Sequence, residues 1–403
     1  METIYRFEPC FPEAVSGEIL DLVAEVARKS ESLGGRLDPH AARSLADLVR
    51  VMSSYYSNLI EGHNTLPRDI EAAMEGELSD DDARRDLQIE ARVHVELQRS
   101  IDERFAAGSL ADPASPEFLS WLHKEFYDRV PADFRLVRST TRTLDVIPGR
   151  FRQEPGEEVL VGRHRPPSPE HVRTFMRRFS ERFAFAQLGQ GEKIIAIASA
   201  HHRFNYIHPF VDGNGRVSRL MSHAMALSAG AGAHGLWSVS RGLARGLKRG
   251  LEGRAEYKEM MERADTPRQG DLDGRGNLSE RALKEFIVWF LKVMVDQIDF
   301  MASLYDLKTL ASRLRRLAEI RTDWRREAGV LLDYILRRGE MPRGEAAQVT
   351  GLSARSSSDL LGKLIKDGII QSETPKGPVS LRFKADFADV LFPRLFPERD
   401  VGT

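Results

Sequence analysis

One stretch of twelve residues, HPFVDGNGRVSR at positions 208–219, combines residue types that could bind a strongly charged ligand. Gly213 and Gly215 precede a predicted helix, and glycines let an anion approach the unpaired N–H groups at a helix start. Arg216 and Arg219 are three residues apart, so they share one helical face, where guanidinium groups can bind phosphate oxygens in pairs. These features predict a phosphate-binding loop.

Two other side chains of this stretch could take part in catalysis. Asp212 is a hard oxygen ligand of the kind that holds Mg²⁺ against a polyphosphate. His208, four positions earlier, could accept a proton from an attacking hydroxyl near neutral pH. Together with the loop, these residues predict phosphoryl or nucleotidyl transfer. The alternative is a polar turn with solvated arginines, which the combination of all twelve residues disfavours.

The elements that position this stretch are predicted to be helices. Apolar residues recur with helical spacing at 192–206 before it and at 216–229 after it. Further helices are predicted for residues 18–33, 41–60, 80–105, 169–186 and 282–307. We therefore expect a mainly α protein.

Residues 149–163 interrupt the helical pattern. The strand-like pieces RFRQ and VLVG flank the turn signal EPGE, which predicts a short β-hairpin. An exposed strand edge can pair with an extended peptide through main-chain hydrogen bonds. A plain surface hairpin is the alternative.

The character of the chain changes at about residue 325. Three short helical segments are followed by QSETPKGPVSLRF, an order that predicts a C-terminal winged helix-turn-helix. Residues 355–358 would lie at the start of its recognition helix. Residues 343–384 hold seven Lys or Arg and four Asp or Glu, a net charge of +3. Because this excess is modest, DNA binding and protein docking both stay open.

The chain has 403 residues, of which 41% are hydrophobic and 30% charged, with a formal net charge of −1. This composition is typical of a globular protein and provides no overall field that would attract nucleic acid or a membrane. The single cysteine, Cys10, excludes an internal disulfide framework and indicates a reducing compartment. Because neither a signal peptide nor a membrane-length apolar run is recognisable, we expect a cytoplasmic protein.

A second motif, SSYYSNLIEGHNT, places Ser57 and Glu61 four residues apart and Gly62 directly after them. By itself, this pattern is typical of a helix that ends with a glycine cap.

The stretch HPFVDGNGRVSR resembles the signature of the Fic (filamentation induced by cAMP) family at every signature position, and the likeness extends over about residues 40–300. The resemblance implies an all-helical core that transfers AMP from ATP, with Mg²⁺, to a hydroxyl of a protein. It implies that His208 is the general base for a Ser, Thr or Tyr hydroxyl and that Asp212 binds Mg²⁺. Phe210 would pack beneath the loop. The related Doc branch has lysine in place of Gly215, which favours nucleotidyl transfer over phosphorylation here.

The resemblance also implies a set of nucleotide-binding residues. Gly213, Asn214 and Gly215 would cradle the phosphates, and Arg219 would bind the γ-phosphate. The full set is Phe210, Gly213, Asn214, Gly215, Arg216, Arg219 and Tyr257. Tyr257 would lie against adenine, with core packing as the alternative.

Beside this signature, SSYYSNLIEGHNT resembles the inhibitory motif of the same family. The resemblance implies that Ser57, Glu61 and Gly62 form this motif and that Glu61 pairs with Arg219 in the space of the γ-phosphate. A carboxylate can imitate a phosphate toward arginine. The hairpin at 149–163 resembles the flap with which the family binds target proteins.

The predicted organisation is an N-terminal helical region with the inhibitory motif (1–110), a catalytic core (111–310) and a winged helix (325–403). The favoured function is an autoinhibited protein adenylyltransferase that modifies a target protein or itself. Open alternatives are a nucleotide-sensing regulator that binds DNA through residues 343–384, use of another nucleotide, and removal of AMP. A homodimer is compatible with the sequence.

Overall fold

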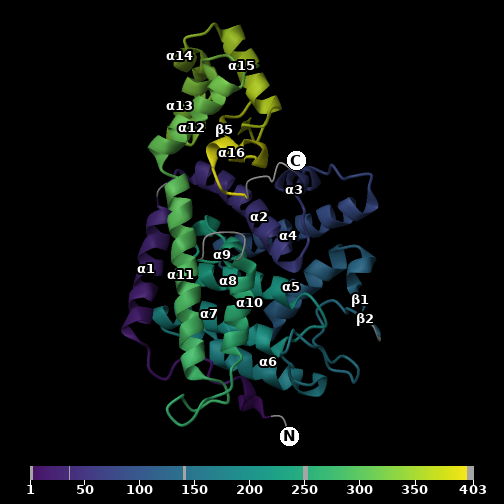
Figure 1. Ribbon diagram of the computed structural model, residues 1–403. Helices are drawn as coiled ribbons and strands as arrows, with labels where there is room; N and C mark the ends of the chain where they lie inside the picture. The colour runs from purple at the N-terminus through teal and green to yellow at the C-terminus, as the bar shows by residue number, and fades with distance from the viewer. Residues whose placement is uncertain (1–2, 36, 139–141, 248–252, 397–403) are drawn as a thin grey trace, which may run out of the picture.

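Two central helices, α7 (Gln190–Ile207) and α8 (Asn214–Ser228), carry the glycine-rich loop between them (Figure 1). The computed structural model describes residues 3–35, 37–138, 142–247 and 253–396. The fold is mainly helical, in agreement with the sequence-based prediction. The other helices of the body are α1 (Gly17–Gly34), α2 (Pro39–Glu61), α3 (Pro67–Met74), α4 (Asp82–Ala106), α5 (Pro116–Arg129), α6 (Pro169–Phe183), α9 (Val239–Arg245), α10 (Gly253–Ala264) and α11 (Glu280–Leu304).

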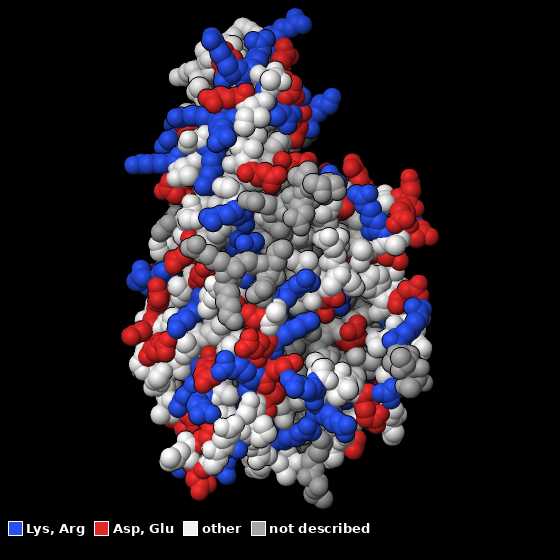
Figure 2. All heavy atoms as spheres, viewed as in Figure 1, with Lys and Arg blue, Asp and Glu red and all other residues white. Residues whose placement is uncertain are grey.

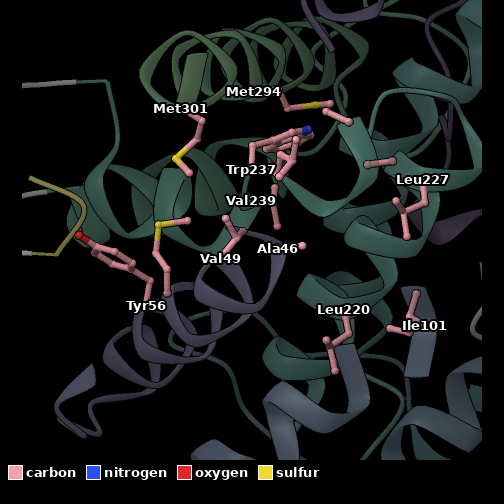
Figure 3. Close-up of a cluster of buried hydrophobic side chains, with 14 of the residues drawn as sticks. Ala46, Val49, Tyr56, Ile101, Leu220, Leu227, Trp237, Val239, Met294 and Met301 are labelled. Carbon is pink, nitrogen blue, oxygen red and sulfur yellow. The ribbon is translucent and has the colours of Figure 1, made fainter. Parts of the chain in front are cut away.

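The body is held together by a buried apolar cluster between helices that are far apart in the sequence (Figure 3). Ala46 and Val49 of α2, Leu220 of α8 and Met294 of α11 belong to it, and each is at most 4% exposed. Burial of such side chains is the main source of stability for packed helices. The cluster therefore ties α2, which carries Ser57 and Glu61, to the helix that follows the loop.

The predicted hairpin at 149–163 is wrong. The antiparallel pair lies upstream, between β1 (Leu136–Arg138) and β2 (Thr143–Asp145), and within 149–163 only Val161 forms an isolated bridge, to His164. The physical reason is Arg152, which is 1% exposed and donates from its backbone N–H to the carbonyl of Pro209. RFRQ therefore packs against the loop instead of pairing with VLVG. The target-binding role of a hairpin stays a prediction.

The C-terminal module begins after α11 and lies at one end of the molecule (Figure 1). Its three-stranded antiparallel sheet has the order β3-β5-β4. This arrangement agrees with the element order predicted for a winged helix, an assignment that stays an interpretation. Its elements are α12 (Leu307–Ile320), α13 (Ala328–Arg338), β3 (Glu340–Met341), α14 (Ala346–Thr350), α15 (Ala354–Lys366), β4 (Ile370–Gln371), β5 (Val379–Leu381) and α16 (Ala388–Leu391).

Helix α15, the predicted recognition helix, is amphipathic. Leu360, Leu361 and Leu364 are buried, whereas Arg355 and Ser358 are exposed at its start. Ser357 is buried and lies 3.3 Å from the hydroxyl of Thr350, so it is not available to a ligand at the surface. On the face shown in Figure 2, Lys and Arg side chains are more prominent than Asp and Glu on this module. On the body, positive and negative side chains are interspersed. DNA binding stays a prediction.

The C-terminal module also returns to the body. The carbonyl of Leu395 accepts hydrogen bonds from the hydroxyl of Tyr56 at 3.1 Å and from Nε of Arg241 at 3.3 Å. In Figure 3 the Tyr56 hydroxyl points to this returning segment. The predicted boundaries at 110, 310 and 325 stay an interpretation. None of the described helices is both long and apolar enough to cross a membrane.

Candidate active site

The loop between α7 and α8 has a fixed backbone geometry. α7 ends at His208, which adopts a left-handed conformation with φ 49° and ψ 62°, and Gly213 with φ 80° precedes α8. The side chain of Asn214 accepts from the N–H of Phe210 and donates to its carbonyl, both at 2.9 Å. Asn214 therefore closes the loop through its side chain, while its backbone forms the first residue of α8.

Phe210 forms the floor of this loop. It is fully buried and stacks on His123 of α5, with 3.8 Å between ring centroids and 9° between planes. Nδ1 of His123 accepts from the N–H of Gly149 at 2.8 Å, so Nε2 carries the proton and donates to the carbonyl of Asp212 at 3.2 Å. Burial lowers the pKa of His123 to about 4, which keeps the ring in this neutral form. Phe210 thus supports the loop from below.

The Asp212 carboxylate is oriented by Tyr127, also from α5. The Tyr127 hydroxyl donates to Oδ2 of Asp212 at 2.8 Å, and burial raises the pKa of Tyr127, so the hydroxyl keeps its proton. A Cβ on Gly213 would lie 2.7 Å from the Tyr127 ring. Glycine is therefore required here both by the positive φ and by the close approach of Tyr127.

Arg219 is bonded to the helix that carries the second motif. Its Nε donates to the hydroxyl of Ser57 at 2.9 Å, and its Nη2 donates to Oε1 of Glu61 at 2.6 Å. The same carboxylate oxygen lies 2.6 Å from the position that a Cβ on Gly215 would take. An anion thus occupies the N-terminal end of α8. Gly62, with φ 93°, caps the end of α2 directly after Glu61.

Arg216 is bonded to a different carboxylate. Its Nη2 donates to Oε1 of Glu90, which lies on α4 and is fully buried. The other oxygen of Glu90 lies 2.7 Å from Nδ1 of His63. The Arg216 guanidinium also lies over the Phe126 ring, 5.2 Å from its centroid. Both loop arginines are therefore paired with acids in this structure.

His208 stands beside a buried guanidinium. Nε of Arg152 donates to the carbonyl of His208 at 2.9 Å, and Nη2 donates to the carbonyl of Ile207 at 3.3 Å. Desolvation, followed by the positive charge of Arg152, lowers the pKa of His208 to about 4. The imidazole is therefore neutral at physiological pH and able to accept a proton.

Tyr257 lies in the core beneath this site. It is 7% exposed, and its hydroxyl lies 2.8 Å from Nε2 of His201, which is fully buried. The Tyr257 ring is nearly parallel to the Trp289 ring, with 6.3 Å between the ring centroids. These contacts correspond to the core-packing alternative for Tyr257, and a role toward adenine stays a prediction.

The chain matches the Fic/DOC family over residues 113–226, from the start of α5 to near the end of α8. Residues 113–226 form a Fic domain. The Fic domain thus contains the whole loop together with Phe210, His123 and Tyr127. Ser57, Glu61 and Glu90 reach it from helices outside the matched residues.

Curated relatives of this Fic domain are named protein adenylyltransferase Fic. The protein from Drosophila mojavensis is 33% identical over 143 residues, which are 35% of this chain and 28% of that protein. The protein from Drosophila grimshawi is 38% identical over 82 residues, 20% of this chain and 16% of that protein. The chain therefore matches less than a third of the length of these relatives.

Solved Fic structures share the fold. A Fic family protein from Desulfovibrio desulfuricans has a TM-score of 0.52 at 18% identity, covering 93% of this chain and 99% of that one. The Fic-1 protein of C. elegans has a TM-score of 0.50 at 16% identity, covering 71% of this chain and 72% of that one. At these identities the likeness establishes the architecture around the Fic domain.

The sequence-based reasoning missed the residues that support the loop and its arginines, which are Tyr127, His123, Arg152, Glu90 and His63. Glu90 left a signal, because it shares a helical face with Val93 and Leu97, and an acid on an apolar face indicates a buried partner. Arg152 and Tyr127 left no comparable signal.

Proposed function

We propose that this chain is a protein adenylyltransferase that moves AMP from ATP to a Ser, Thr or Tyr hydroxyl of a protein. The observation that carries the proposal is the anion site at the start of α8, where a carboxylate contacts Arg219 beside Gly215. A helix N-terminus with an arginine binds phosphate in the same way as it binds a carboxylate. The names of the curated relatives give the transferred group.

In this proposal, His208 takes the proton from the target hydroxyl. The hydroxyl oxygen then forms a bond to the α-phosphorus of ATP, the bond from that phosphorus to the bridging oxygen breaks, and pyrophosphate leaves. The neutral His208 imidazole is in the correct form for this step. Arg216 and Arg219 would neutralise the charge of the outer phosphates, and the loop would fix their position.

Asp212 would hold the Mg²⁺ ion. A carboxylate oxygen oriented by Tyr127 suits a hard cation, and Mg²⁺ in nucleotide sites usually takes one or two carboxylates together with phosphate oxygens and water. Among the described residues, no three His, Cys, Asp or Glu side chains form a site by themselves. The residues present therefore fit an ion shared between Asp212 and the nucleotide. The ion would neutralise charge on the phosphates.

We further propose that Glu61 inhibits the site in cis. Its carboxylate lies where a phosphate would meet both Arg219 and the N-terminus of α8, so ATP in the productive position requires its displacement. Desolvation alone would raise the pKa of Glu61, but Arg219 and Arg216 outweigh it and lower the pKa to about 2. Glu61 is thus a permanent anion at any physiological pH.

The test is intact-mass analysis after incubation with Mg²⁺ and each nucleoside triphosphate in turn, with and without a bait mixture of proteins. The variants are Glu61→Gly, His208→Ala and the two combined. We expect Glu61→Gly to add the mass of one AMP to a large fraction of the protein and the unaltered chain to modify a smaller fraction. Variants that lack His208 should modify none. Addition of another nucleotide would identify a substrate other than ATP. Loss of AMP from a modified protein would indicate that the site removes AMP. Labelling that persists in His208→Ala would contradict the proposal.

The rival function is a nucleotide-sensing regulator that binds DNA through the C-terminal module. The exposed Arg355 and Ser358 at the start of α15 are the observation in its favour. A sequence-specific footprint that changes with ATP, without AMP on any protein, would favour the regulator.

A further inference from the structure

The two loop arginines have carboxylate partners of different kinds. Glu61 lies at the end of α2 with 30% of its side chain exposed, whereas Glu90 lies in the middle of α4 with 0% exposed. An exposed side chain at a helix end can move into solvent, where water replaces its hydrogen bonds. A carboxylate buried in a helix interior has no such exit.

Glu90 is held from two sides. Oε1 accepts from Arg216, and Oε2 lies 2.7 Å from Nδ1 of His63. The hydrogen bond to Glu90 raises the pKa of His63, which favours the cationic imidazole as its second partner. Removal of a buried, doubly bonded acid would leave buried charge uncompensated, which is costly. ATP can therefore displace Glu61 far more readily than Glu90.

We propose that Glu90 is the permanent partner of Arg216 and a positioning residue that holds this guanidinium toward the nucleotide phosphates. Arg216 keeps donors for that purpose, because Glu90 occupies only Nη2 and the buried Nε has no hydrogen-bond partner among the described residues. The inference rests on the proposed function for the role of the phosphates. It assigns opposite effects to the two acids: Glu61 blocks nucleotide binding, and Glu90 supports it by positioning Arg216.

Glu90 compensates the charge of Arg216 in both states of the site, whereas Glu61 compensates the charge of Arg219 only in the resting site. Displacement of one carboxylate is then sufficient to open the site to ATP.

The experiment compares Glu90→Gln and Glu90→Asp in the Glu61→Gly background, where the blocking acid is absent. Glu90→Gln keeps the shape and one acceptor but removes the charge, and Glu90→Asp keeps the charge but shortens the reach. Glu103→Gln, on the exposed surface of the same helix, is the matched control. Thermal unfolding checks that each variant is folded. The readouts are the Kd for ATP with Mg²⁺ from a binding titration, and kcat and KM for AMP transfer.

We expect Glu90→Gln to lower kcat/KM for ATP by about tenfold to a hundredfold, because misplacement of a binding group by about 1 Å has effects of that order. Kd should rise in parallel, and Glu90→Asp should lie between. The Glu103 variant should equal its parent. An unchanged or tighter Kd would overturn the inference, because Glu90 would then be irrelevant or a second blocking acid. The binding titration decides this even if no transfer is detected, in which case the proposed function fails separately.

A double-mutant cycle with Arg216→Gln separates positioning from a general structural role. If Glu90 acts through Arg216, Glu90→Gln should weaken ATP binding in the parent and have no further effect once Arg216 is replaced. Full additivity of the two changes in the Kd for ATP would contradict action through Arg216.

Discussion

Glu61 and Arg219 form an ion pair across the start of α8, with 2.6 Å between Oε1 and Nη2. The Arg219 side chain is 1% exposed and the Glu61 side chain is 30% exposed, so the pair lies at the boundary between core and solvent. Ser57, one helical turn before Glu61, holds the same guanidinium through its hydroxyl. The pair therefore joins the second sequence motif directly to the last residue of the first.

The first prediction separates the two contacts that α2 makes with Arg219. Glu61→Gly should raise the initial rate of AMP transfer strongly, and Ser57→Ala should raise it less. The Ser57 hydroxyl only helps to hold the guanidinium, and a hydrogen bond to a charged group contributes about 1.5–3 kcal/mol. Rates with labelled ATP measure both effects. Glu77→Gly, an exposed acid outside the site, is the control and should match the unaltered chain. Equal rates in all four proteins would contradict inhibition by Glu61.

The second prediction concerns Gly215. A methyl group there would lie 2.6 Å from Oε1 of Glu61 and 3.0 Å from Nη1 of Arg219, so Gly215→Ala should loosen the ion pair. It should still not activate the protein, because the methyl group lies where the phosphate must approach. Unfolding of Gly215→Ala, Glu61→Gly and the double variant should show a coupling of about 0.5–3 kcal/mol. Additive changes, or rapid transfer by Gly215→Ala, would contradict this geometry.

The third prediction is the pH dependence of transfer in the Glu61→Gly background. Because the pKa of His208 is lowered to about 4, its neutral form is present above that pH and is lost as the pH falls through it. The rate should therefore change little between about pH 8 and pH 5.5, where a histidine with an ordinary pKa would be about 90% protonated. A pH-rate profile with circular dichroism at each pH measures this. A decline centred near pH 6.5 would exclude a lowered pKa for the base.

The fourth prediction concerns the metal requirement. Tyr127→Phe removes the hydroxyl that orients Asp212 but leaves the ring that packs against Gly213. We expect the Mg²⁺ concentration for half-maximal transfer to rise by about tenfold to a hundredfold, as for other residues that orient metal ligands. Tyr334→Phe, whose hydroxyl bonds Glu345 in the C-terminal module, should show the Mg²⁺ requirement of the parent. An unchanged requirement in Tyr127→Phe would indicate that Asp212 needs no support.

The loop could be predicted because its residues are consecutive, and the helices on either side could be predicted because their apolar residues repeat along the chain. The residues of other helices that bond to the loop and its arginines could not be predicted. Glu90 reaches Arg216 across 126 residues of sequence, and Tyr127 reaches Asp212 across 85. Contacts of this kind depend on how α4 and α5 pack against α8, and the periodicity within one helix does not specify its neighbours.

The incorrect hairpin has a related cause. RFRQ alternates as a strand does, but alternation cannot distinguish an arginine that faces solvent from one whose guanidinium is buried among main-chain carbonyls. Arg152 is of the second kind, with bonds to the carbonyls of Glu157, Pro167 and Ile207.

The fifth prediction tests Arg152 as a positioning residue for His208. Its guanidinium binds the carbonyls of Ile207 and His208 at the C-terminal end of α7, where a cation is also favoured by the helix dipole. Arg152→Met should lower kcat by about tenfold to a hundredfold through misplacement of the base. The KM for ATP should change little, because Arg152 binds main-chain carbonyls at the end of α7 and acts on the base. Arg152→Lys keeps the charge but loses the planar guanidinium, so its kcat should lie between those of Arg152→Met and the parent.

The pH profile distinguishes this role from a simple loss of stability. Without the positive charge of Arg152, the pKa of His208 should rise from about 4, so the fall in rate on acidification should begin at a higher pH in Arg152→Met than in Arg152→Lys. The charges of Asp212 and His164 also act on the imidazole, and both residues are unchanged in the two variants. Arg163→Met, at an exposed position of the same segment, should leave kcat and the profile unaltered. A raised KM with an intact kcat would instead place Arg152 in nucleotide binding.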